Sequence, residues 1–299
     1  MNLYKSLIFI LYLGIFLGSG FRTPAQSRDS ITVYGTLDTV QVIRQRIQHA
    51  NEANAGARVT HISPAILQAN KTRSLAELLT DHTSIYIKSL GTGALSTASF
   101  RGTSASQTRV NWNGINITPP LSGTFDFSQI PVFFTDNINL YYGSSHVKNG
   151  TGAIGGSVNL FTDTDWNRGV NGRVLAEYGS YNTYTVGGQA NISGNKSASK
   201  TRLYYQHSDN DYTYLNKVLT NIPFREKRQD AAYSQFGIMQ EGYFRVSPYT
   251  RLTAVAWYQK NHRNLPQPLG VVNRSQEDQE ENNFRGYAGL DFSRGIHEL

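Results

Sequence analysis

The sequence contains no cysteine and few charged residues. Only 16% of its 299 residues are Asp, Glu, Lys or Arg, whereas a soluble globular domain has roughly 25%. The lack of cysteine excludes disulfide frameworks, cysteine-bound zinc and thiol chemistry. After the N-terminal segment, no apolar run approaches the length of a membrane-spanning helix, about 20 residues. A helical membrane protein is therefore excluded.

The abundant residues favour extended chain. Glycine, tyrosine, asparagine, serine and threonine are common, and this mixture is typical of strands and turns. The formal net charge is +7, but the basic residues are scattered along the chain. We therefore expect a solvated surface and no nucleic-acid partner.

Motifs of enzymes are also missing. The seven histidines show no metal-ligand spacing, and no nucleophile elbow of the G-x-S-x-G type occurs. Residues 150–155 match G-x-G-x-x-G, but a predicted strand follows where a dinucleotide site needs a helix. We expect no enzymatic activity, no cofactor and no metal site.

The N-terminus has the three parts of a secretory signal peptide. Lys5 precedes an apolar run over residues 7–17, and small residues follow from Gly18. The run is too short to serve comfortably as a membrane anchor. We expect residues 1–25 to form a signal peptide, with cleavage between Gly20 and Gln26, and the protein to be exported.

The region up to about residue 163 predicts a small α+β domain. Residues 63–69 and 74–79 predict short helices, because each segment begins with a serine that can cap a helix N-terminus. Short strands separated by glycines are predicted at residues 85–87, 108–112, 137–141 and 156–160.

After Trp166, apolar and polar residues alternate, which is typical of strands with two different faces. The alternation is clearest at residues 184–192 and 284–292. Six strands are predicted, near residues 172–180, 183–193, 201–211, 231–247, 250–261 and 282–293.

The connections separate a transmembrane barrel from a soluble β-sandwich, which alternates in the same way. After the first hairpin, short connections alternate with long loops at residues 212–230 and 262–281. Up-and-down membrane barrels have this pattern, with the short turns on the periplasmic side. Twelve of the 18 tyrosines lie in this region, as in the aromatic girdles of such barrels. We therefore predict barrel strands.

Five segments occur in an order known from one family. They are residues 74–79 with 85–87, residues 100–102, residues 110–114, residues 123–131, and residues 142–145 with 152–159. With the signal peptide and the strands, they resemble the N-terminal part of a TonB-dependent outer-membrane receptor. The resemblance implies an α+β plug domain followed by antiparallel transmembrane β-barrel strands, with the barrel incomplete in this chain. It implies a signal peptide (1–25), a TonB-box region and linker (26–45), a plug domain (46–165) and the first part of the barrel (166–299).

The resemblance also implies site residues. The plug motif falls on Arg101, Gly102, Asn113, Gly114, Gly143, Gly152, Gly155 and Gly156. Asn113 and Asn139 depart from the family pattern, which has acidic residues there, so the electrostatics of the plug differ while turn and strand remain compatible. A TonB box, an extended segment that adds to TonB as a strand, is implied at Asp29, Ser30, Ile31, Thr32, Val33 and Tyr34. The alternative for this segment is an ordinary first strand of the plug.

The function implied by the resemblance is energy-coupled uptake of a scarce ligand, a ferric siderophore or cobalamin, across the outer membrane. The implied partners are TonB, this small ligand and outer-membrane lipid. Two alternatives stay open: a glycan-uptake receptor of the same architecture, and a secreted plug-like binding protein without transport activity. Since plugged barrels have about 22 strands and six are predicted here, we expect a truncated or partial reading frame.

Overall fold

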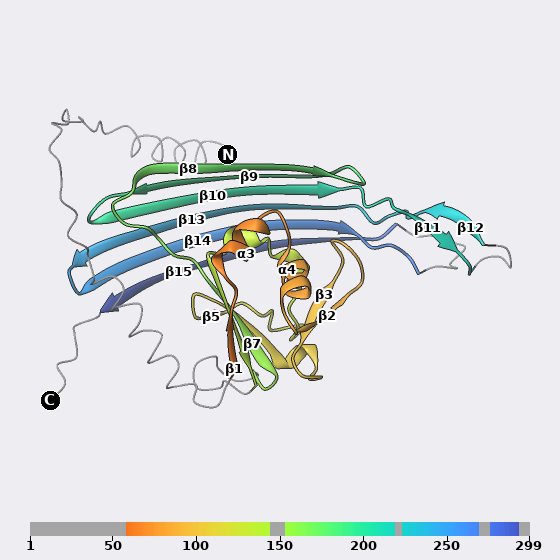
Figure 1. Ribbon diagram of the computed structural model, residues 1–299, viewed down its shortest axis with the longest axis horizontal. Helices are drawn as coiled ribbons and strands as arrows, with labels where there is room; N and C mark the ends of the chain where they lie inside the picture. The colour runs from red at the N-terminus through yellow and green to blue at the C-terminus, as the bar shows by residue number, and fades with distance from the viewer. Residues whose placement is uncertain (1–57, 144–152, 219–222, 269–275, 293–299) are drawn as a thin grey trace, which may run out of the picture. The chain divides into compact units, whose positions relative to one another are not determined.

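The computed structural model describes residues 58–143, 153–218, 223–268 and 276–292. The chain divides into two compact units, Met1–Ala53 and Asn54–Leu299, and the described residues all belong to the second. This second unit contains an α+β domain and a six-stranded antiparallel sheet (Figure 1). The expected signal peptide, the segment 29–34 and Gly152 lie outside the described residues.

Both predicted helices of the α+β domain are confirmed, and each begins at the predicted serine. Helix α3 spans Pro64–Ala69, and the Ser63 hydroxyl accepts a hydrogen bond from the backbone N–H of Ile66. Helix α4 spans Leu75–His82 and begins with a capping box between Ser74 and Glu77. The Ser74 N–H donates to the Glu77 carboxylate at 2.8 Å, so two backbone donors at the start of the helix are satisfied.

A five-stranded sheet forms the core of the α+β domain. Its order is β1-β6-β7-β4-β5, with β1 at Arg58–His61 and β5 at Ile115–Asn116; β4 and β7 are parallel and the other pairs are antiparallel. Strands β4 (Thr108–Trp112), β6 (Asn137–Tyr142) and β7 (Gly156–Phe161) agree with the prediction to within one residue. Their fully buried side chains Val110, Ile138, Leu140 and Val158 pack with Leu78 and Leu79 of α4.

Several short strands were not predicted. They are β1 (Arg58–His61), β3 (Ser96–Ser99) and β5 (Ile115–Asn116), while β2 (Tyr86–Ser89) lies near a predicted strand. Strand β3 reads Ser-Thr-Ala-Ser and β5 has only two residues, so neither shows an alternating apolar pattern. Their partners in the sheets therefore determine that they are strands.

The six predicted barrel strands are confirmed. They are β8 (Gly169–Gly179), β9 (Thr183–Ser193), β10 (Ser197–Ser208), β13 (Tyr233–Ser247), β14 (Thr250–Asn264) and β15 (Asp278–Phe292). Each pairs antiparallel with its neighbours in the order β15-β14-β13-β10-β9-β8. Residues 194–196 and 248–249 connect neighbouring strands at one end of the strands, which we call the short-turn end. Residues 209–232 and 265–277 extend from the opposite end of the strands, which we call the long-loop end.

The predicted loop 212–230 is wrong in part, because it contains a separate hairpin. Strands β11 (Thr213–Asn216) and β12 (Phe224–Lys227) pair with each other beyond the long-loop end of the sheet (Figure 1). Tyr214 and Asn216 both donate to the Glu226 carboxylate, at 2.9 and 2.8 Å. These hydrogen bonds join the two strands of the hairpin. Because its residues show no alternating apolar pattern, the sequence did not predict it.

The six-stranded sheet has one apolar exposed face and one face against the α+β domain. Val174, Val186, Leu203 and Phe284 are among its exposed apolar residues, with Val174 82% exposed. The interpretation of the tyrosines as girdle residues is wrong for Tyr204, Tyr233 and Tyr243, which are buried. Within the described ranges, no helix has the length and apolar character needed to cross a membrane.

Replacing Gly156 by alanine tests the packing of the α+β domain. A Cβ at this position would lie 2.5 Å from the Tyr141 carbonyl oxygen and 2.7 Å from the Phe100 ring. We expect Gly156→Ala to lower the free energy of unfolding by about 1–3 kcal/mol, measured by urea denaturation. At Gly188 a Cβ would meet nothing within 4 Å, so Gly188→Ala is the control. Equal stability of both variants would contradict this packing.

Candidate functional site

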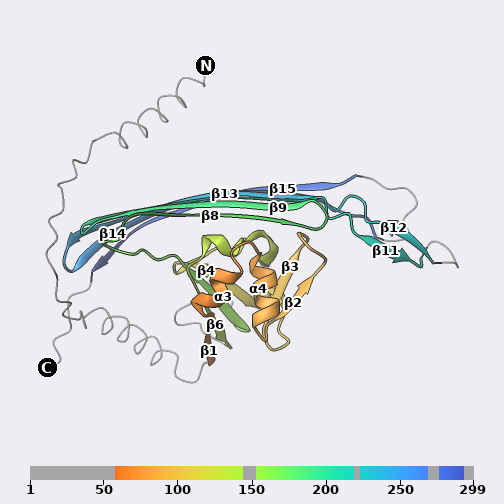
Figure 2. The ribbon, with the colours of Figure 1, turned by 45° about the horizontal axis from the view of Figure 1, so that its top comes forward.

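One segment of the α+β domain, residues 126–136, follows the inner face of the six-stranded sheet. It contains two short 3₁₀ helices, η2 (Phe127–Gln129) and η3 (Val132–Phe134). Gln235 of β13 donates to the Ser128 carbonyl at 2.8 Å, and Gln259 of β14 donates to the Gln129 carbonyl at 3.1 Å. Figure 2 shows the α+β domain on this one face of the sheet. We call residues 126–136 the interface segment.

The interface segment ends in a buried cluster of charged side chains. Arg202 of β10 is fully buried, donates to the Phe133 carbonyl at 3.0 Å, and pairs with the carboxylate of Asp136. On the other side it lies 3.2 Å from Glu241 of β13, which is also fully buried. Lys200 of β10 lies 3.0 Å from Asp136 and donates to the Asp163 carbonyl. We call Asp136, Lys200, Arg202 and Glu241 the charge cluster.

Asp136 is the residue of the α+β domain that holds this cluster together. Burial raises the pKa of its carboxyl, but Arg202 and Lys200 outweigh this effect and lower the pKa to about 2. Asp136 is therefore ionised at neutral pH. Removing one partner of such a pair leaves an uncompensated charge in a site with little water, and this is strongly destabilising.

Lys71 adds a further cation beside the cluster. Its ammonium group donates to the carbonyls of Thr135 and Val132, at 2.5 and 3.4 Å. Burial lowers the pKa of Lys71 to about 8, while Asp136 opposes this shift. The backbone carbonyls at the end of the interface segment thus bind a buried ammonium that is mostly protonated at neutral pH.

An aromatic stack joins the two parts on the side of β14 and β15. The rings of Trp112 and Trp257 have centroids 5.2 Å apart, and Phe134 lies 5.3 Å from Trp257. Tyr287 stands edge-on to Trp112 at 5.5 Å, and the guanidinium of Arg285 covers Trp257 at 4.8 Å. The two tryptophans and Phe134 are each 1% exposed, so this part of the interface is dry.

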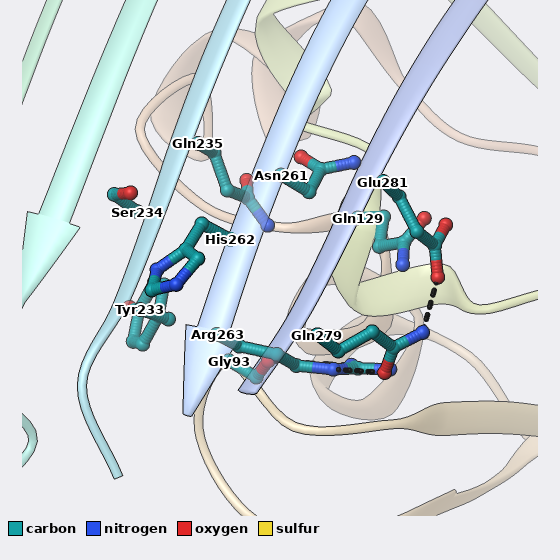
Figure 3. Close-up of a pocket in the computed structure, with 10 residues that line it drawn as sticks. All are labelled: Gly93, Gln129, Tyr233, Ser234, Gln235, Asn261, His262, Arg263, Gln279 and Glu281. Atoms are coloured by element: carbon teal, nitrogen blue, oxygen red, sulfur yellow. Dashed lines mark hydrogen bonds between the residues drawn. The ribbon is translucent and has the colours of Figure 1, made fainter. Parts of the chain in front are cut away.

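A small cavity of about 10 Å³ lies at the long-loop end of the interface (Figure 3). Gly93 and Gln129 line it from the α+β domain, and side chains of β13, β14 and β15 line it from the sheet. Arg263 donates to the Asp126 carboxylate at 2.7 Å and to Gln279 at 2.8 Å. Asn261 is 7% exposed and its amide has no hydrogen-bond partner in the described structure. The volume suits about one water molecule.

The loop between β2 and β3 reaches the bases of two long loops. Asn210 donates from its amide to the Thr92 carbonyl at 3.0 Å. A cavity of about 40 Å³ lies between this loop and the sheet, and its lining includes Tyr212, Arg228 and Pro266. Aromatic, cationic and backbone groups therefore meet at the long-loop end.

Five residues of the expected plug motif gather around one turn. Arg101 and Gly102 both have positive φ, at 49° and 77°. A Cβ on Gly143 would lie 3.7 Å from the Arg101 guanidinium, and one on Gly155 would overlap Thr103. Gly156 packs against Phe100, the residue before this turn.

Asn113 and Gly114 lie at a different turn, which joins β4 to β5. Their φ values of 49° and 85° suit the two-residue hairpin turn expected from an Asn-Gly pair. Asn113 also bonds Thr162 twice, at 2.9 Å each, and the Thr162 hydroxyl lies 3.4 Å from the hydroxyl of Tyr243 in β13. This turn therefore stands close to the sheet.

The sequence analysis missed the charge cluster, although a signal was present. Lys200, Arg202 and Tyr204 are two residues apart on β10, and Leu203 and Tyr205 alternate with them on the exposed face. Two cations on the inward face of a strand indicate a buried ionic partner. Its identity, Asp136, could not be read from spacing because 64 residues separate it from Lys200.

Within the described ranges, no three acidic or histidine side chains are grouped so that they could hold a metal ion. The arrangement instead consists of an α+β domain fixed to a curved sheet by charge, aromatic and backbone contacts.

Comparison with known proteins identifies the α+β domain. Residues 51–157 match the family model of the TonB-dependent receptor plug domain. A curated relative, the vitamin B12 transporter BtuB of Photobacterium profundum, is 32% identical over 135 residues, which are 45% of this chain and 22% of that protein. BtuB of Vibrio cholerae is 32% identical over 126 residues, or 42% of this chain and 20% of that protein. The chain thus spans about a fifth of the length of these relatives.

Solved structures show the same fold for the two parts together. The ferripyoverdine receptor of Pseudomonas aeruginosa matches with a TM-score of 0.59 at 16% identity, covering 78% of this chain and 31% of that one. The siderophore receptor PiuA of Acinetobacter baumannii matches with a TM-score of 0.53 at 20% identity, covering 69% of this chain and 26% of that one. At these identities the likeness concerns the fold.

Replacing Asp136 by asparagine tests the charge cluster. We expect Asp136→Asn to destabilise the contact by about 3 kcal/mol, because the two buried cations Arg202 and Lys200 then share Glu241 as their one remaining carboxylate partner. The pKa of Asp136 falls from 3.8 to about 2 on folding, so its stabilisation is complete above about pH 5 and is lost progressively as the pH falls through 3.8 to about 2. Urea denaturation as a function of pH measures both effects.

The control for this prediction is Asp165→Asn. Asp165 pairs with Arg168 at 3.1 Å, but both side chains are 66% exposed, so the loss should stay within about 0.5 kcal/mol. The role of the cluster would be contradicted if both substitutions lowered the free energy of unfolding equally. It would also be contradicted if Asp136→Asn lost stability at acid pH as the unsubstituted protein does.

Proposed function

Because the chain belongs to the TonB-dependent receptors, we propose that it takes part in energy-coupled uptake of a scarce ligand across the outer membrane. Its α+β domain is the plug domain, and its six-stranded sheet is part of the barrel wall. The observation that carries the proposal is the buried contact along the interface segment, since a plug bound to the inner face of a barrel wall closes the lumen until it is rearranged.

The exposed face of the wall supports an outer-membrane location. Its apolar residues include Val170, Val174 and Leu290, at 79%, 82% and 65% exposure. Such a face is costly in water and stable against lipid. This argues against the alternative of a secreted plug-like binding protein. The short-turn end then faces the periplasm and the long-loop end the exterior.

The cargo is proposed to be cobalamin or a ferric siderophore. BtuB relatives are named vitamin B12 transporters, and the structural neighbours include siderophore receptors. The long-loop end offers Tyr212, Arg228 and the loop around Thr92 as a first contact for a ligand. A glycan-uptake receptor of the same architecture is the second candidate, and competition of unlabelled cobalamin, ferric siderophore and oligosaccharide for surface binding separates the three classes.

Coupling to TonB is proposed to use Asp29, Ser30, Ile31, Thr32, Val33 and Tyr34 as an added strand. Deleting these six residues should abolish uptake and leave ligand binding at the cell surface intact, because binding needs only the exterior side of the plug and loops. Uptake and binding of radiolabelled cyanocobalamin and of a ferric siderophore measure the two steps separately.

The control is deletion of residues 38–43, which lie in the expected linker; this deletion shortens the chain before the plug by the same length and should leave uptake unchanged. Unchanged uptake after deletion of residues 29–34 would refute the assignment of the coupling segment. Loss of ligand binding in that variant would show that the segment acts on folding instead.

A further inference from the structure

Helix α3 of the plug and strands β8, β9 and β10 of the wall border a cavity of about 360 Å³. The helix lies on the inner side of the sheet (Figure 2), and its residues Pro64 and Gln68 line the cavity. The volume holds a small polyatomic ion together with several water molecules. The proposed function assigns no role to this cavity.

On the wall side, inward-facing positions of β8, β9 and β10 form two neighbouring rows across the sheet. Residues opposite each other on adjacent strands lie about 5 Å apart, and residues two apart on one strand share a face. Each row therefore presents three side chains to the plug. All six are amides or cations, and none is a carboxylate. The rows are Asn171, Asn191 and Lys200, and Arg173, Gln189 and Arg202.

The amides of these rows form a ladder of hydrogen bonds that runs in one direction. Gln189 donates to the Asn191 side chain at 3.1 Å, and Asn191 donates to the Asn171 side-chain oxygen at 2.6 Å. Because Asn171 accepts in this ladder, its NH₂ group remains as the terminal donor. Arg173 lies two residues away on the same face of β8, so two hydrogen-bond donors of the wall lie side by side.

Two cations, one on each side of the cavity, lack a carboxylate partner. Arg173 of the wall donates to the side-chain oxygen of Gln68. Lys71 of the plug donates to the carbonyls of Val132 and Thr135. In the described part of the chain, neither cation forms an ion pair. Lys71 is only 7% exposed, so water compensates little of its charge.

Three carboxylates also line the cavity, and two of them belong to ion pairs. Asp165 pairs with Arg168, and Asp136 pairs with Lys200. The third carboxylate, Asp163, is exposed. The lining thus contains four cations against three carboxylates, and its two buried or bridging carboxylate contacts are already made.

The charges around Lys71 are predominantly positive. Burial lowers the pKa of Lys71 to about 8, and Asp136 opposes this shift. The three cations Arg202, Arg173 and Lys200 lower the pKa further. The ammonium group is still mostly protonated at neutral pH. An anion between Lys71 and Arg173 would offset the repulsion between them.

We propose that this cavity binds a small oxyanion between Lys71 of the plug and Arg173 of the wall. The guanidinium of Arg173 offers parallel N–H donors that match two oxygens of such an anion. The Asn171 amide donates beside it, and Lys71 supplies a charge from the opposite side. The bound anion is a resident ligand that joins the plug to β8. It is distinct from the transported cargo, so the site does not depend on the proposed function.

Urea denaturation of the whole receptor in a neutral detergent tests this site, with inorganic phosphate as the probe. The urea midpoint is measured at neutral pH in millimolar potassium phosphate and in potassium chloride of the same ionic strength. We expect phosphate to raise the midpoint saturably, because a ligand that binds only the folded receptor stabilises it. Each variant is compared with itself in chloride, so a loss of stability caused by the substitution alone does not affect this shift.

Two variants should lose the phosphate-dependent shift. Arg173→Gln removes the charge but keeps an amide donor toward Gln68. Asn171→Asp replaces the terminal donor by a carboxylate but keeps an oxygen acceptor for Asn191. We expect each substitution to weaken phosphate binding by about tenfold or more. Arg173→Lys, which keeps the charge, should retain part of the shift.

The matched control is Arg168→Gln. Arg168 lines the same cavity, but its charge is already paired with Asp165, and both side chains are 66% exposed. This variant should keep the full phosphate-dependent shift.

Three results would each overturn the inference. Without a saturable shift in the unsubstituted receptor, the cavity binds water only. An equal shift in the receptor, Arg173→Gln and Asn171→Asp would mean that phosphate acts through the solvent or at another site. If Arg168→Gln lost the shift to the same degree as Arg173→Gln, phosphate would respond to the overall charge of the cavity and not to a site between Lys71 and Arg173.

Discussion

The structure depends on one constraint: two buried charges on strand β10 must be neutralised by residues that lie far away in the sequence. Lys200 and Arg202 face the inside of the sheet, where Glu241 is also buried. Within the wall alone these are two cations against one anion, and Asp136 of the plug supplies the second carboxylate. A buried charge without a partner at hydrogen-bond distance is strongly destabilising. The carboxylate of Asp136 in the plug therefore neutralises the excess positive charge of the wall. This ion pairing fixes where the interface segment ends.

Other contacts of the interface segment with the wall lie along the same strands as the charge cluster and along the neighbouring strand β14. The interface segment runs from Asp126, paired with Arg263 near the long-loop end, to Asp136 in the charge cluster. Between these two ionic contacts, its carbonyls accept hydrogen bonds from the wall, and Phe134 packs between Tyr204 and Trp257. Ion pairs at both ends of the interface segment and aromatic packing between them therefore stabilise the contact between plug and wall.

Much of this fold could be predicted from the sequence because it is encoded locally. Ser63 and Ser74 mark the starts of both helices, and the period-two alternation gives six wall strands. What could not be predicted depends on distant partners. Strand β3 and the β11–β12 hairpin lack an apolar pattern, and no local pattern identifies Thr72 and Thr162 as the partners of Tyr204 and Tyr243. The residues of the plug motif fold into two turns as expected, but their functional role, like that of residues 29–34, stays a prediction.

The central claim is that plug and wall are coupled through Asp136 and Arg202, and a double-mutant cycle on these two residues tests it most directly. The free energy of plug release is measured by urea titration for the receptor, Asp136→Asn, Arg202→Gln and the double variant. Close charge pairs in one network couple by about 0.5–3 kcal/mol, and we expect a value near the upper end because both groups are largely buried. A coupling energy of zero would mean that the two residues act independently, and would contradict the account.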